Sequence, residues 1–163
     1  MTEAQHVDTD AEAARSRASP IARAALLAYV LLIVYASWYP FSGWRDNGVP
    51  LFAFLNLVKQ RYWTGFDVGV NIAGYIPFGI LIVLSLYPRI RGIWAVLLAA
   101  LAGVLVTGTM EAVQNFLPSR VPSNLDFITN AGGCLAGAIL GALWAPGLLD
   151  RSRLFKLRRR WFL

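Results

Sequence analysis

The sequence predicts an all-α membrane protein in which four transmembrane helices form one bundle. Of its 163 residues, 57% are hydrophobic and only 15% are charged, and the mean hydropathy is +0.53. This balance is too apolar for an ordinary soluble domain of this length. The apolar residues fall into four runs, each near the ~20 residues that a bilayer requires. Most Lys and Arg residues lie between or beyond these runs, as in multi-pass membrane proteins.

The four apolar runs predict transmembrane spans over residues 21–38, 68–87, 93–117 and 127–149. Basic residues precede the first run, as in a secretory signal. However, the small-residue cleavage pattern is missing and three further runs follow, so we expect a retained helix. The domain organisation that follows is a disordered cytoplasmic tail over residues 1–19, a membrane domain over residues 20–149 and a basic cytoplasmic tail over residues 150–163.

The distribution of basic residues predicts that both termini are cytoplasmic. In that orientation, eleven of the 15 Lys and Arg residues lie inside and four lie outside, as the positive-inside rule requires. The net charge of +6 therefore indicates membrane orientation and not nucleic-acid binding. Residues 150–163 interleave basic and apolar side chains, which suits a segment on an anionic inner leaflet or a plain positive-inside signal.

The first outer loop is long and aromatic, and it contains a short apolar run over residues 51–58. Eight residues are too few to cross a bilayer, so the run predicts an interfacial segment that caps the bundle. The alternative is an aromatic belt that only anchors the protein. The aromatic residues are Trp38, Tyr39, Phe41, Trp44, Phe52, Phe54, Tyr62, Trp63 and Phe66.

The second and fourth spans begin with the same polar pattern. Asp67 and Asn71 open the second span, and Asp126 and Asn130 open the fourth. A spacing of four residues places each pair on one helix face. A polar face directed at lipid would be costly, so we expect the two Asp-Asn faces to meet inside the bundle. The matched pattern also suggests two related helical hairpins.

Glu111 lies inside the third span, about 9 Å from its end at the rise of an α-helix. Gln114 follows one turn later, and Arg120 is the only cation in the second outer loop. We expect Arg120 to serve as a counter-ion to Asp67, Glu111 or Asp126. An acid at this depth is either a structural hub that ties helices together or a working acid/base or ligand-binding group.

Other residue types limit the chemistry. Cys134 and His6 are the only residues of their kinds, so the sequence predicts no intrachain disulfide, no metal site and no histidine-based catalysis. We therefore expect no cofactor. Gly133, Gly137 and Gly141 repeat every four residues in the fourth span, a spacing that lets a neighbouring helix approach closely.

Two motifs carry a family resemblance. The pattern D-x3-N-x2-G-Y-I-P-F-G spans residues 67–79, and E-x2-Q-x-F-L-P-x-R-x5-D-x3-N-x2-G spans residues 111–133. Together they resemble the VanZ-like family of bacterial membrane proteins, over about residues 24–146. The resemblance implies a role in the bacterial cell envelope and a location in the cytoplasmic membrane. The family name comes from a protein associated with teicoplanin resistance, which implies a link to glycopeptide antibiotics without specifying a reaction.

Three functions are compatible with these residues. The leading hypothesis is an outer-leaflet pocket that binds an envelope lipid, a lipid-linked cell-wall precursor or a glycopeptide-related ligand. In the second, the pocket is a hydrolase or transferase site in which Glu111 and Asp126 act as an acid/base pair. The third is a subunit of a transporter or membrane complex. The pocket residues in the first hypothesis are Asp67, Asn71, Glu111, Gln114, Arg120, Asp126 and Asn130.

Overall fold

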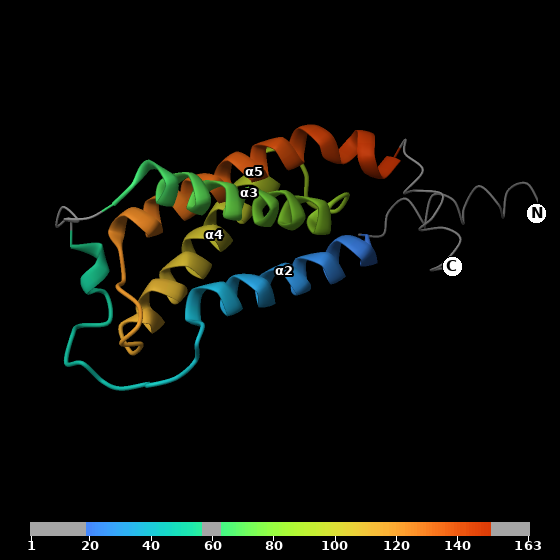
Figure 1. Ribbon diagram of the computed structural model, residues 1–163. Coiled ribbons are helices and arrows are strands. Elements are labelled where there is room, and N and C mark those ends of the chain that lie inside the picture. The colour runs from blue at the N-terminus through green and yellow to red at the C-terminus, as the bar shows by residue number, and fades with distance from the viewer. Residues whose placement is uncertain (1–18, 57–62, 151–163) are drawn as a thin grey trace, which may run out of the picture.

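The computed structural model describes residues 19–56 and 63–150 (Figure 1). In order, its elements are α2 (Pro20–Trp38), the 3-10 turn η1 (Ala53–Leu55), α3 (Gly65–Leu86), α4 (Ile93–Gln114) and α5 (Asn124–Asp150). Each of the four α-helices is long and apolar enough to cross a membrane. The prediction of an all-α bundle with four transmembrane helices is therefore confirmed. Apart from Ser19 and Asp150, the two predicted tails lie outside the described residues.

The helices alternate in direction along the chain. Figure 1 shows α3 against α5, with α4 behind them and α2 along the opposite side of the bundle. The α2–α3 and α4–α5 connections lie together at one end, which we call the loop end. The short α3–α4 turn lies at the other end. Both α3 and α5 begin at the loop end, so the first turns of these two helices are brought side by side.

Glycines on two helices allow α3 and α5 to pack closely. A Cβ atom added to Gly133 or Gly137 of α5 would collide with the carbonyl oxygen of Ile72 or Ile76 of α3, and the same change at Gly79 of α3 would collide with the carbonyl oxygen of Cys134. Gly141 continues this contact against Ile80. The predicted close approach at the glycine repeat is thus confirmed, and α3 is the partner.

Three helix ends differ by more than one residue from the predicted span limits. The second and fourth spans were expected to begin at residues 68 and 127, but α3 begins at Gly65 and α5 at Asn124. The first turns of these helices are polar, so they lie outside the apolar runs from which the spans were predicted. They are helical because Thr64 and Ser123 cap them through their side-chain oxygens. Helix α4 ends at Gln114, not at residue 117, because a tight turn follows in which the Leu117 amide binds the Gln114 carbonyl.

The α2–α3 loop packs on the α4–α5 connection. Within the predicted apolar run, residues 53–55 form η1, and the Phe54 ring lies 5.7 Å from the Phe127 ring of α5. The side chains of Asn47 and Asn115 bind backbone carbonyls across the two connections, at 2.8 and 2.9 Å. These contacts agree with a capping role for the loop. Residues 57–62, which include Tyr62, lie outside the described residues.

Candidate functional site

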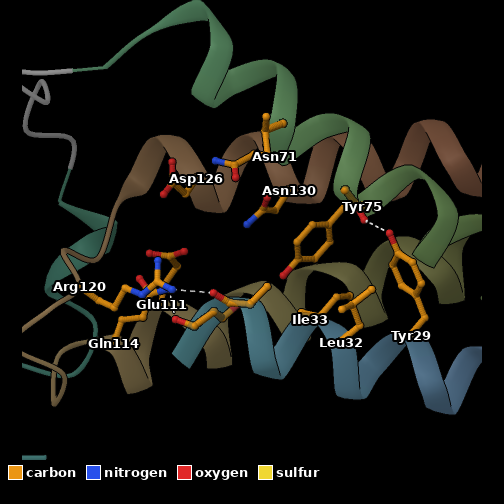
Figure 2. A pocket seen from close by; sticks show the side chains of 14 residues that line it. Tyr29, Leu32, Ile33, Asn71, Tyr75, Glu111, Gln114, Arg120, Asp126 and Asn130 are labelled. Atoms are coloured by element: carbon orange, nitrogen blue, oxygen red, sulfur yellow. Dashed lines mark hydrogen bonds between the residues drawn. The ribbon is translucent and has the colours of Figure 1, made fainter. Parts of the chain in front are cut away.

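A cavity of about 490 Å³ lies between the helices toward the loop end, and all four helices contribute to its lining (Figure 2). Six of the seven predicted pocket residues line it. The six come from α3, α4, α5 and the α4–α5 connection: Asn71, Glu111, Gln114, Arg120, Asp126 and Asn130. Residues more than 40 positions apart in the sequence are therefore gathered around one space. The prediction that separate helices direct their polar residues at each other is correct for this set.

Asp67 is the predicted residue that does not line the cavity. Its carboxylate accepts hydrogen bonds from the backbone amide and the hydroxyl of Thr64, at 2.9 and 2.8 Å. Thr64 in turn accepts from the Asp67 amide, which completes a reciprocal capping box at the start of α3. Asp67 therefore stabilises a helix end. The prediction that it lines the pocket is wrong.

Asp126 occupies the equivalent position in α5 but has a different role. Its backbone amide binds the Ser123 hydroxyl oxygen at 3.1 Å, as in a capping box. In a capping box the backbone amide of Ser123 would donate to the Asp126 carboxylate. Here that amide donates instead to Glu111 at 2.7 Å. The Asp126 carboxylate is left to face the cavity, where it interacts with the side chains of Asn71 and Ser123. Of the two Asp-Asn faces, Asn71 of one thus meets Asp126 of the other.

Glu111 is almost completely buried, with 2% of its surface exposed. One carboxylate oxygen accepts the Ser123 amide and joins α4 to the start of α5. Glu111 also lines the cavity. The structural-hub interpretation thus accounts for one of its two oxygens, and the other has no hydrogen bond among the described residues.

Arg120 and Gln114 bind the last turn of α2. The Arg120 guanidinium donates to the carbonyl oxygens of Tyr39 and Ala36, at 3.2 and 2.7 Å. The Gln114 amide donates to the Ser37 carbonyl at 3.2 Å. The carbonyl end of a helix carries partial negative charge and unpaired acceptors, so it attracts a cation. Arg120 makes no ion pair within the part of the chain that the structure describes, and its predicted pairing with a carboxylate is wrong in this respect.

Two tyrosines that the sequence did not lead us to predict also line the cavity. The Tyr29 hydroxyl donates to the Gly74 carbonyl at 2.7 Å and links α2 to α3. Tyr75 extends from α3 into the space between the helices (Figure 2). Its hydroxyl is close to Thr107, but the two groups do not meet the geometry of a hydrogen bond, and the hydroxyl is buried without a partner. Tyr75 follows Asn71 by four residues, a spacing that signals a shared face. No comparable signal marks Tyr29.

Asn130 presents a second unpaired atom. Its amide nitrogen donates to the Thr107 hydroxyl at 3.1 Å, whereas its Oδ1 atom is buried with no hydrogen-bond partner. Both Asn130 and Tyr75 are 6% exposed. Buried polar atoms are normally satisfied by protein or water, so these two atoms have a hydrogen-bonding capacity that no group in the described residues uses.

The aromatic residues in the described part of the α2–α3 loop do not line this cavity. The described loop residues instead border a second, smaller space of about 240 Å³, where Phe54 lies near Asn115 and Pro122. The described part of the loop therefore borders this neighbouring space and not the larger cavity. The loop's polar contacts go to the α4–α5 connection, which holds it beside the pocket.

Comparison with known proteins agrees with the motifs. Neither curated proteins nor solved structures give a match. The VanZ/LLP1 protein family matches residues 24–145, a range that includes every residue lining the cavity. Because this match covers most of the sequence, the chain belongs to the VanZ/LLP1 family.

Proposed function

We propose that this protein is a multi-pass component of the bacterial cytoplasmic membrane whose cavity binds the polar head of an envelope lipid or of a lipid-linked cell-wall precursor. With both termini in the cytoplasm, the loop end faces outward and the cavity opens in the outer leaflet. Binding of a glycopeptide-related ligand or its target at this site would connect the protein to antibiotic resistance.

The observation that supports this proposal most strongly is the unpaired state of Tyr75 and Asn130 at the cavity. A structural hub would satisfy its own buried polar atoms, because each one left unpaired costs about 1–3 kcal/mol. Here the Tyr75 hydroxyl and the Asn130 Oδ1 atom have no protein partner among the described residues. A ligand head, with its water, would supply the missing hydrogen bonds. The volume of about 490 Å³ lies within the range of small-molecule sites.

Lipid retention provides the test. The full chain, purified in a mild detergent, is incubated with a total lipid extract from a bacterial envelope, and bound lipids are counted by native mass spectrometry. Asn71→Leu keeps the side-chain volume similar and removes the amide that faces the cavity. We expect this variant to lose about tenfold in lipid retention, the effect of one or two hydrogen bonds.

Asp67→Asn is the matched control, because Asp67 lies at the start of α3 outside the cavity. It should retain lipid as the wild type does. A thermal unfolding scan confirms that both variants are folded. Equal retention by the wild type and Asn71→Leu would contradict the proposed site.

An enzymatic function is the second candidate, since Glu111 and Asp126 line the same cavity. A pair of acids in one buried site can divide the roles of general acid and general base. Incubation with lipid-linked cell-wall precursors, followed by mass spectrometry, distinguishes the candidates. Turnover that is lost in Asp126→Asn supports catalysis, whereas intact precursor supports binding alone.

A further inference from the structure

Several side chains at the cavity offer hydrogen-bond acceptors that no protein donor saturates. Tyr29, Gln114 and Arg120 donate to backbone carbonyls of α2 or α3, and the Asn130 amide nitrogen donates to Thr107. Four groups can accept further hydrogen bonds: the Asp126 carboxylate, which already meets the side chains of Asn71 and Ser123, one Glu111 oxygen, the Asn130 Oδ1 atom and the Tyr75 hydroxyl. All four accept hydrogen bonds, and only the hydroxyl also donates. A ligand that fits this set must bring its own donors.

The charges at the cavity also favour a ligand that carries hydrogen-bond donors. Two carboxylates and one guanidinium border the cavity, and no ion pair joins them in the described ranges. The guanidinium is instead directed at the carbonyl end of α2. A carboxylate removed from water without a cation is unfavourable, so the part of the cavity beside Asp126 and Glu111 is suited to a cationic group. A primary ammonium brings one positive charge and three N–H donors.

The cavity also has an apolar wall at which acyl chains can leave. Leu32 of α2 and Val70 of α3 line it and are 54% and 51% exposed. Farther from the loop end, the Tyr29 hydroxyl donates to the Gly74 carbonyl and joins the same two helices. The exposed lining residues of α2 and α3 therefore mark the side of the cavity at which the acyl chains of a bound lipid would reach a surrounding bilayer.

We propose that the ligand is a lipid whose head carries a primary amine, with the ammonium among Asp126, Glu111, Asn130 and Tyr75 and the acyl chains between α2 and α3. This inference rests on the proposed function, because it specifies the lipid class that the same cavity binds. The unpaired Tyr75 and Asn130 atoms accept from the ammonium, and Asp126 supplies the compensating charge.

Three defined lipids with identical acyl chains test the head-group chemistry. Phosphatidylethanolamine has the primary amine, phosphatidylcholine has the positive charge without N–H donors, and phosphatidylglycerol has hydroxyl donors without the cation. The full chain in detergent is titrated with each lipid and adducts are measured by native mass spectrometry. We expect phosphatidylethanolamine to bind at least about tenfold more tightly than the others, the effect of one charge-assisted hydrogen bond.

The variants Asp126→Asn and Asp67→Asn form a matched pair, because the two residues occupy the same position in two helix caps. Asp126→Asn should remove the preference for phosphatidylethanolamine, and Asp67→Asn should retain it. Equal or tighter binding of phosphatidylglycerol that depends on Asn71 would overturn the amine assignment and leave the proposed lipid site intact. Failure of all three lipids and of the total envelope extract to bind in an Asn71-dependent way would overturn both.

Discussion

At the scale of single residues, the start of α5 depends on an exchange of hydrogen-bond partners. Ser123 caps the helix through its hydroxyl, but its backbone amide binds Glu111 of α4 and not Asp126 of its own helix. In α3, by contrast, Thr64 and Asp67 bind each other. Glu111 therefore has a positioning role: by taking the Ser123 amide, it leaves the Asp126 carboxylate available to the cavity.

Substitution of Glu111 should separate this hydrogen bond from the charge. Glu111→Gln keeps a carbonyl oxygen that can accept from Ser123, so we expect little loss of stability. Glu111→Ala leaves a buried amide without a partner, which costs about 1–3 kcal/mol. The measurement is the free energy of unfolding in mixed detergent micelles, followed by circular dichroism. Equal stability of the two variants would show that the Ser123 contact contributes nothing.

Residue patterns were sufficient to find most of the polar residues that line the cavity. The four-residue spacing and the buried acid identified six cavity residues, because polar groups within apolar helices must find each other. They did not distinguish Asp67 from Asp126, since both follow a capping Thr or Ser by three residues. The difference arises from Glu111, which is far away in the sequence. Tyr29 was missed because its hydroxyl donates to a backbone atom, the Gly74 carbonyl oxygen. No sequence pattern marks a backbone acceptor.

At the scale of helices, the fold was predictable because apolar length determines which segments cross the membrane. The helix ends were less predictable, since caps such as Thr64 extend a helix into polar sequence. The glycine repeat predicted a close contact but not its partner. That partner is α3, whose Ile72 and Ile76 backbone lies against α5. This contact brings the two helix starts together and places Asn71 opposite Asp126.

Two glycines of α5 allow a direct test of this contact. Gly137→Ala would push a Cβ atom into the Ile76 backbone, which cannot move aside as a side chain could, so we expect a loss of about 1–3 kcal/mol in stability. Gly132→Ala is the control, because a Cβ atom there meets nothing within 4 Å and gains up to about 1 kcal/mol in helix propensity. Unfolding in mixed micelles measures both. A neutral Gly137→Ala would contradict the close packing of α3 on α5.

At the scale of the whole molecule, the cavity lies toward one end of the bundle, the loop end, and the start of α2 and the end of α5 lie toward the other (Figure 1). The orientation of the chain in the membrane would therefore decide which leaflet supplies the proposed ligand. The bias of Lys and Arg predicts that the loop end is extracytoplasmic, which would give the cavity access to lipids and precursors of the outer leaflet.

Cysteine labelling in intact cells tests this orientation. The native Cys134 is fully buried, so it should give little background with a membrane-impermeant maleimide. Val49, which is 49% exposed in the α2–α3 loop, and Ala4 in the N-terminal segment can each be changed to Cys without altering the charge bias that sets orientation. We expect Val49→Cys to react in intact cells and Ala4→Cys to react only after the membrane is permeabilised. The reverse pattern would place the cavity in the inner leaflet, and a role in capturing extracytoplasmic precursors would then be untenable.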